Sequence, residues 1–251
     1  MVFSFTGFPT IAYNLATNKT DTASRALGDA GGQYLEHAYF SQLTGDESYR
    51  RTVDRIRDRI RIQFWNPASG LYKLNINTRP SSVGYSDWEV SLASGGRDFY
   101  YALLRSYLQS GGRLVEALQL YNEAVSSVLQ NTEVITTSTS TGNGTGDGLV
   151  WVRNAVLNKG SAAPFEYEKR MSYSACYLGA MFALGAATFK AGDDRCSLLA
   201  RRQRQLAVEL TRTCRLAATG TTTKLGPGSW KVPIAAEEKF VYDGSNHYYL
   251  R

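Results

Sequence analysis

The sequence contains few of the residues from which metal centres and nucleophilic triads are built. Its 251 residues include only two histidines, His37 and His247, which are far apart along the chain. The three cysteines show no metal-binding spacing. A zinc site or a Ser-His-Asp triad is therefore poorly supported. So few cysteines neither establish nor exclude an oxidising compartment.

Long apolar runs are also missing. No stretch reaches the roughly 18 to 20 residues that span a bilayer, and the residues after Met1 lack the basic, apolar and small-residue series of a signal peptide. We therefore expect no membrane segment in this chain. The net charge of +6 is mild and comes largely from arginines in two helical segments, so nucleic acid is not an expected partner.

The apolar residues that are present recur at intervals of three and four, as they do on one face of a helix. A chain of this length allows one domain with a substantial core, and we expect residues 1–251 to form a single domain. Helix pairs joined by loops and short hairpins favour an all-α toroid over a parallel α/β sheet. We expect helices at about residues 24–43, 46–65, 96–110, 113–130, 172–190 and 192–217, and short strands at 71–77 and 149–152.

Two of these helices have unusual features. Gly31 and Gly32 each weaken the first helix by about 1 kcal/mol relative to Ala, which either tight helix packing or a nearby ligand would explain. Several arginines of the second helix lie off its apolar stripe, with Asp54 and Asp58 among them. This pattern favours a solvated face with ion pairs, and a polyanion site is the alternative.

Polar and aromatic residues gather at two places that suit a binding site. The turn at Gly95 and Gly96 leads into a helix with charge in its first turn and aromatics in its body. Such a helix start presents polar side chains over a pocket. The preceding loop holds Trp88 beside acidic residues, a combination in which a ring stacks on a sugar and a carboxylate accepts from its hydroxyls. The same loop residues could equally be packed against the protein.

The segments of this chain resemble, in order, those of glycoside hydrolase family 47, the class I α-1,2-mannosidases. The chain is similar to a middle piece of that family's domain. The similar segments are 27–46 (LGDAGG, LEH and LTGD), 70–77 (GLY and NIN), 96–105 (GRDFYYALLR), 171–177 (MSYSACY), 207–214 (AVELTRTC) and 249–251 (YLR).

The resemblance implies a fold, an activity and a set of site residues. The fold is an incomplete (α/α)7 barrel of paired helices with short β-hairpins between the pairs. The activity is inverting hydrolysis of terminal α-1,2-mannose on a high-mannose N-glycan or glycoprotein. Asp29 and Arg251 match positions near the substrate pocket, whereas Trp88 is added on its chemistry alone. Asp98 becomes a candidate catalytic carboxylate if the match is shifted by one residue.

Several positions depart from the family pattern. In the ungapped match Arg97 stands at the family's Asp, Tyr101 at its Glu and Tyr173 at its His. The segments that carry the family's acid and base do not match any part of residues 1–251. We therefore expect an incomplete chain that is inactive alone. The alternatives are a non-catalytic, lectin-like mannose-binding relative in glycoprotein quality control, and a helical scaffold that binds protein.

The resemblance also implies a cofactor, a disulfide and a location. The family uses Ca²⁺, but its ligand segment has no counterpart in this chain, and we expect no metal ligand here. Cys176 and Cys214 match the family's cysteine positions, which implies a disulfide between them and leaves Cys196 free. This bond implies the secretory pathway, in the endoplasmic reticulum or Golgi. Three buried free thiols are the alternative.

Overall fold

The chain divides into two compact units. The first is formed by residues 1–127 and 156–165, and the second by residues 128–155 and 166–251. The computed structural model describes residues 7–10, 12–20, 25–67, 69–77, 84–85, 89–130, 135–137, 149–157, 165–189 and 194–231.

The first unit is built mainly from helices, with strands of two or three residues between them. Its helices are α1 (Leu27–Gly31), α2 (Tyr34–Thr44), α3 (Ser48–Phe64), α4 (Arg97–Gln109) and α5 (Val115–Gln130), of which the last three residues belong to the second unit.

Short antiparallel strands join these helices. β1 (Tyr13–Asn14) pairs with β2 (Lys19–Thr20), and β4 (Trp65–Asn66) pairs with β5 (Leu71–Tyr72) in a hairpin directly after α3. β6 (Asn75–Asn77) lies between β3 (Arg25–Ala26) and β7 (Gly84–Tyr85). A bridge between Lys73 and Val90 connects β8 (Glu89–Val90) to the segment between β5 and β6.

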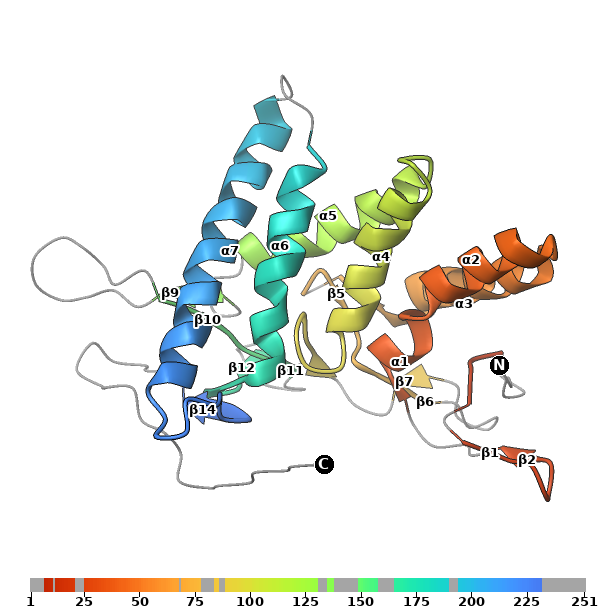
Figure 1. Ribbon diagram of the computed structural model, residues 1–251, viewed down its shortest axis with the longest axis horizontal. Coiled ribbons are helices and arrows are strands. Elements are labelled where there is room, and N and C mark those ends of the chain that lie inside the picture. Colours follow the sequence, from red (N-terminus) through yellow and green to blue (C-terminus); the bar gives the residue numbers. More distant parts are fainter. Residues whose placement is uncertain are drawn as a thin grey trace, which may run out of the picture. The chain divides into compact units, whose positions relative to one another are not determined.

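The second unit contains two long helices and two antiparallel strand pairs. The 3-10 helix η2 (Tyr173–Tyr177) leads directly into α6 (Leu178–Ala187), and α7 (Asp194–Thr219) lies beside α6 (Figure 1). The strand pairs are β9 (Ile135–Thr137) with β10 (Val150–Val152), and β13 (Arg170–Ser172) with β14 (Ser229–Lys231). β11 (Ala155–Leu157) and β12 (Phe165–Tyr167) lie where the chain passes between the units.

The predicted helix-rich architecture is confirmed, with differences at the helix ends. The expected helix at 24–43 is instead two helices, α1 and α2, separated at Gly32 and Gln33. The break occurs where two glycines reduce helix propensity, and α1 ends with the Gly32 N–H donating to the Gly28 carbonyl at 2.8 Å. The expected helix at 172–190 begins later, because residues 173–177 form the tighter 3-10 turn η2.

The core of the first unit is an aromatic cluster at the junction of α4 and the β4–β5 hairpin. Tyr72 lies edge-on to Phe99 with ring centroids 5.1 Å apart, and Phe99 lies edge-on to Tyr100 at 5.5 Å. Each such pair contributes about 0.5 to 1.5 kcal/mol beyond the area it buries. The predicted apolar stripe of α3 packs in the same core, because Ile60 and Phe64 are fully buried.

Gly31 is explained by helix packing. A Cβ atom at this position would overlap the ring of Phe99, and it would lie 2.9 Å from Cδ1 of Ile60. Both neighbours are buried side chains of the core. Of the two explanations that the sequence left open, close packing of α1 against α3 and α4 is the one that the contacts support.

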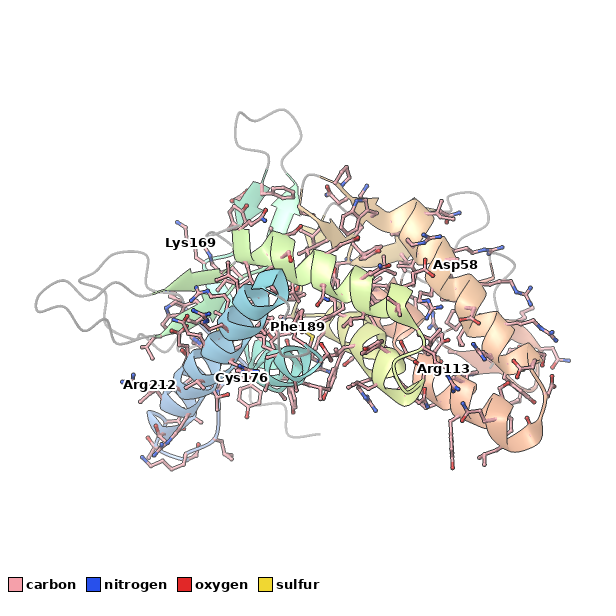
Figure 2. The ribbon with its side chains drawn as sticks, turned by 90° about the horizontal axis from the view of Figure 1, so that it is seen from above. Asp58, Arg113, Lys169, Cys176, Phe189 and Arg212 are labelled. Carbon is pink, nitrogen blue, oxygen red and sulfur yellow. A yellow bond between two sulfur atoms is a disulfide. The ribbon has the colours of Figure 1, made fainter. Side chains whose placement is uncertain are left out.

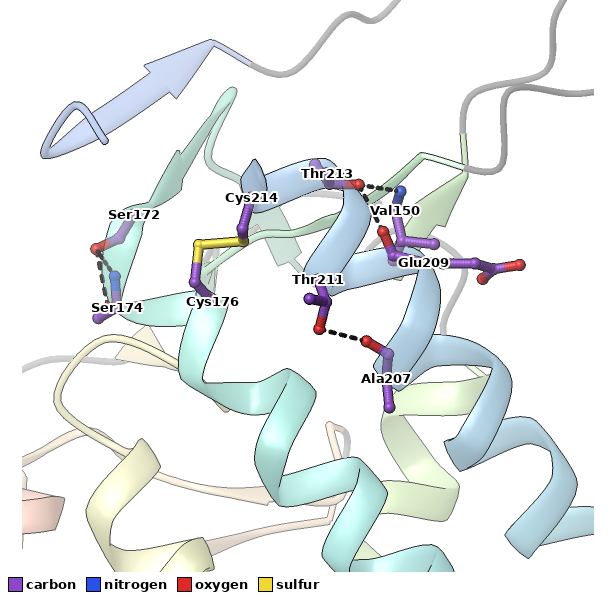
Figure 3. The surroundings of a disulfide bond; sticks show 9 residues. All are labelled: Val150, Ser172, Ser174, Cys176, Ala207, Glu209, Thr211, Thr213 and Cys214. Atoms are coloured by element: carbon purple, nitrogen blue, oxygen red, sulfur yellow. Dashed lines mark hydrogen bonds between the residues drawn. A yellow bond between two sulfur atoms is a disulfide. The ribbon is translucent and has the colours of Figure 1, made fainter. Parts of the chain in front are cut away.

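The predicted disulfide between Cys176 and Cys214 is present (Figure 3). Cys176 lies in η2 just before α6 and Cys214 lies near the end of α7, with Cα atoms 5.8 Å apart, so α6 and α7 are antiparallel. The bond closes a loop of 38 residues, which is worth about 3 to 4 kcal/mol in the chain-entropy model. The side chain of Cys196 lies outside the described residues.

Next to the disulfide, α6 and α7 approach closely at Gly179. A Cβ atom there would lie 2.8 Å from Oγ1 of Thr211, whose hydroxyl donates to the Ala207 carbonyl at 2.7 Å (Figure 3). The Thr213 hydroxyl accepts from the backbone N–H of Val150 at 2.9 Å, which ties β10 to α7.

Among the described residues, no helix is long and apolar enough to cross a membrane.

We expect Gly31→Ala to lower the free energy of unfolding by about 1 to 3 kcal/mol, because the new methyl group must displace the buried ring of Phe99. Chemical denaturation measures this change. Gly228→Ala is the matched control, since a Cβ atom at Gly228 has no neighbour within 4 Å among the described residues. Equal stability of the two variants would show that α1 does not pack on Phe99 as described.

Candidate functional site

The candidate site is formed where the first turns of α1 and α4 meet. The backbone N–H of Gly28 donates to the carbonyl of Gly95 at 2.7 Å, and that of Leu27 donates to the Leu74 carbonyl at 2.7 Å. These bonds join α1 to the turn before α4 and to the segment leading into β6. The start of α4, which the sequence suggested as part of a binding site, therefore lies beside the segment of Asp29, which the family resemblance suggested.

Glycine makes this close approach possible. Gly95 has a φ of +71°, a conformation that favours a residue without a Cβ atom. Cβ atoms added at Gly28 and Gly32 would each lie 3.2 Å from Cβ of Asp98, so the start of α4 rests directly on the glycine face of α1. Asp29, the residue after Gly28, is exposed. Two acidic residues are thus presented to solvent by neighbouring helix ends.

Asp98 is paired with the residue that precedes it. The Arg97 guanidinium donates from Nε to Oδ1 of Asp98 at 2.9 Å and from Nη2 to Oδ2 at 3.1 Å. The side chain of Asp98 is 56% exposed and that of Arg97 is 26% exposed. Each carboxylate oxygen accepts one bond from this guanidinium and keeps a second lone pair, which can accept from a water molecule or a ligand hydroxyl.

The sequence profile of Glycosyl hydrolase family 47 matches residues 3–251. The chain belongs to this family. The mannosyl-oligosaccharide α-1,2-mannosidase IA of Drosophila melanogaster is 29% identical over 255 residues, covering 98% of this chain and 34% of that protein. The human mannosyl-oligosaccharide 1,2-α-mannosidase IB is 30% identical over 252 residues, covering 98% of this chain and 35% of that protein. The chain spans about a third of the length of these curated relatives.

A solved structure from the same group of enzymes has a similar fold. The α-1,2-mannosidase from Trichoderma reesei superposes with a TM-score of 0.73 and 17% identity, covering 91% of this chain and 43% of that protein. At this identity the similarity concerns the fold alone. It agrees with the helix-rich architecture described above.

Only part of the predicted family 47 site can be located. Asp29 and Asp98 lie on the adjoining ends of α1 and α4. Trp88 and Arg251 lie outside the described residues. Tyr173, at the family's His position, lies in η2 of the second unit, where it is 40% exposed and its ring lies against Gly226.

Among the described residues, the side chains of the kinds that commonly hold metal ions are those of the acidic residues, histidines and cysteines. None of the His, Cys, Asp and Glu side chains in these parts of the chain form a group of three or more that would hold a metal ion.

Two buried tyrosines, Tyr72 and Tyr100, lie in the core next to the start of α4. The Tyr72 backbone N–H donates to the Tyr100 hydroxyl at 3.0 Å in the core. Burial raises the pKa of Tyr100 strongly, and burial, followed by the charge of Glu123, raises the pKa of Tyr72 to about 12. Both phenols are therefore neutral at physiological pH. The guanidinium of Arg105 lies over the ring of Tyr101, with its carbon 5.3 Å from the ring centroid. In the sequence match Tyr101 stands at the family's Glu position.

A cavity beside α3 and α5 was not predicted from the sequence. It lies in the first unit and is lined by Arg61, Trp65, Tyr72, Glu116, Gln119, Leu120 and Glu123. The spacing of its acidic residues on α5 was visible in the sequence. The hairpin aromatics that complete the cavity are brought to α5 only by the fold.

We expect Tyr100→Phe to lower the free energy of unfolding by about 1 to 3 kcal/mol, because it leaves the buried N–H of Tyr72 without an acceptor. Arg97→Ala, three residues earlier in α4, should change stability by no more than about 1 kcal/mol, since exposed ion pairs contribute little. Denaturation of both variants measures the difference. A larger loss for Arg97→Ala would mean that the Arg97–Asp98 pair is part of the structural framework.

Proposed function

We propose that the whole protein hydrolyses terminal α-1,2-linked mannose of high-mannose N-glycans and glycoproteins with inversion, and that residues 1–251 bind this sugar but do not hydrolyse it alone. The observation that carries the proposal is the backbone bond from Gly28 to Gly95, which places Asp29 and Asp98 on adjoining helix ends. Exposed carboxylates at a helix junction can accept hydrogen bonds from the hydroxyls of a sugar. Membership of family 47 and the names of the curated relatives, which are mannosyl-oligosaccharide α-1,2-mannosidases, identify mannose as the sugar.

The proposal includes the architecture around this site. Residues 1–251 are assigned to one domain, in which the helix pairs form part of an (α/α)7 barrel with short hairpins between the pairs. The similarity to the Trichoderma reesei enzyme over 91% of this chain supports this assignment. Arg251 and Trp88 are assigned to the same substrate site, Arg251 from its match to the family and Trp88 from its chemistry.

The reaction proposed for the whole family domain is inverting hydrolysis. Such a reaction needs an acid and a base about 6.5 to 9.5 Å apart, with a water molecule between them. Asp98 remains the candidate catalytic carboxylate of this chain, but both of its oxygens accept from Arg97. In the arrangement described, its direct role is to bind substrate or to hold Arg97 at the pocket.

A second candidate function is binding without hydrolysis, as in a lectin. The Arg97–Asp98 pair favours it, because both oxygens of Asp98, the candidate catalytic carboxylate, accept from a guanidinium. Either function belongs in the secretory pathway, and we assign the protein to the endoplasmic reticulum or Golgi. The disulfide between Cys176 and Cys214 supports this location, since thiols of the cytosol stay reduced.

We expect the 251-residue chain to release no mannose from a nine-mannose glycan. Loss of a general acid or base costs about 10²- to 10⁴-fold per group, and Asp98 is held by Arg97. The measurement is free mannose after incubation with and without Ca²⁺, with the Trichoderma reesei enzyme as the positive control. Calcium-dependent turnover by this chain would contradict the expectation and favour hydrolysis over simple binding.

We expect Asp29→Ala to weaken binding of α-1,2-mannobiose by about tenfold, the effect of losing a hydrogen bond to a charged group. Its melting temperature should change little, because Asp29 is exposed. Asp58→Ala is the matched control, an exposed aspartate on α3 of the same unit (Figure 2). Unchanged binding together with a large loss of stability would make Asp29 a structural residue.

A further inference from the structure

A cavity of about 310 Å³ opens between the end of α3, the β4–β5 hairpin and α5. Its volume lies at the lower end of the range of about 300 to 1,000 Å³ that is typical of small-molecule sites. It shares no residue with the site at the start of α1 and α4. All of its lining residues belong to the first unit, so its shape depends on that unit alone.

The floor and one wall of the cavity are aromatic and fixed. Trp65 and Tyr72 are opposite each other in the β4–β5 register, with ring centroids 5.0 Å apart. Tyr72 is only 1% exposed and is packed against Phe99, whereas Trp65 is half-buried and presents part of its indole to the cavity. An indole held in this way is a preformed surface on which an apolar ring face can lie.

The other wall is a polar face of α5. Glu116, Gln119 and Glu123 are spaced by three and four residues, so they lie on one side of the helix. Arg61 of α3 pairs with Glu116 at 3.2 Å. Among the described residues, Arg61 thus pairs with Glu116, and none forms an ion pair with Glu123 beside the cavity.

The Tyr72 hydroxyl adds a hydrogen-bond donor to this polar face. The phenol stays protonated because burial, and next the negative charge of Glu123, raise the pKa of Tyr72 to about 12. No other described residue forms a hydrogen bond with this hydroxyl. A buried phenol that lines a cavity without a protein partner is a polar group that a bound molecule would satisfy.

This mixture of groups selects among ligand classes. Two carboxylates against one guanidinium disfavour an anion, and the pairing of Glu116 with Arg61 leaves too few free carboxylates for a metal ion. A basic peptide could pair with the carboxylates, but the positive charge of Arg61 would repel it. A neutral sugar uses every group, because its hydroxyls both donate and accept, and its ring has an apolar face for Trp65.

We propose that this cavity is a second glycan-binding site, which takes a single neutral hexose, stacked on Trp65 and hydrogen-bonded to Glu123. The choice of mannose as that hexose rests on the proposed function. The site would hold one branch of an oligomannose glycan while another branch occupies the site at α1 and α4. Occupation of both sites at once would raise the affinity for branched glycans above that for a single mannose.

The test follows the indole N–H signal of Trp65 in the ¹H–¹⁵N spectrum of the labelled protein, titrated with methyl α-mannoside. Trp65→Phe identifies the signal by its disappearance. We expect the sugar to shift this signal in the unaltered protein and in the Asp29→Ala variant alike, because the two sites share no residue. Glu123→Gln should weaken the response about tenfold, while Glu47→Gln, an exposed glutamate at the start of α3, should leave it unchanged.

The outcomes separate this proposal from the proposed function. If Trp65 does not respond to sugar, or if Glu123→Gln has no effect on its response, the second site is wrong whatever Asp29 does. Loss of mannobiose binding in Asp29→Ala with an unchanged Trp65 signal would support the first site alone. If a lysine-rich peptide shifts the Trp65 signal and the sugar does not, the cavity binds a basic partner and the proposal is overturned.

Discussion

The backbone hydrogen bond from Gly28 to Gly95 joins α1 to the turn before α4, and the candidate site of the first unit depends on this junction. It can form only because no side chain stands between α1 and the turn before α4, and the contact of Gly31 with Phe99 extends the same close approach. Asp29 and Asp98 are carried to neighbouring helix ends by this packing. The acidic character of the site is therefore a consequence of how tightly two glycine-rich segments fit together.

The same packing limits the chemistry available at the site. Asp98 rests its Cβ atom against α1, so its carboxylate extends outward, where the guanidinium of Arg97 reaches both oxygens. The Asp98 carboxylate is therefore paired with a guanidinium at the junction of α1 and α4, an arrangement that suits the binding of a hydroxylated ligand.

The aromatic cluster links the two proposed binding sites through the core. Tyr72 contacts Phe99 and Tyr100, which belong to the helix that begins at Asp98, and it also forms the floor of the cavity beside α5. Both sites consequently depend on the same buried rings, although they have no lining residue in common. In the second unit the disulfide plays the corresponding organising role by fixing the start of α6 to the end of α7.

The sequence by itself determined the helices, the apolar face of α3 and, through the resemblance to family 47, the Cys176–Cys214 pair. Helical periodicity is a local property, so it can be read along the chain. The pairing of Arg97 with Asp98 and the cavity behind Trp65 were decided by the tertiary structure. The cavity brings together side chains that are far apart in sequence, and Arg97 could have paired with other acidic residues. Only the packing of α1, α4 and the β4–β5 hairpin determines which of these groups meet.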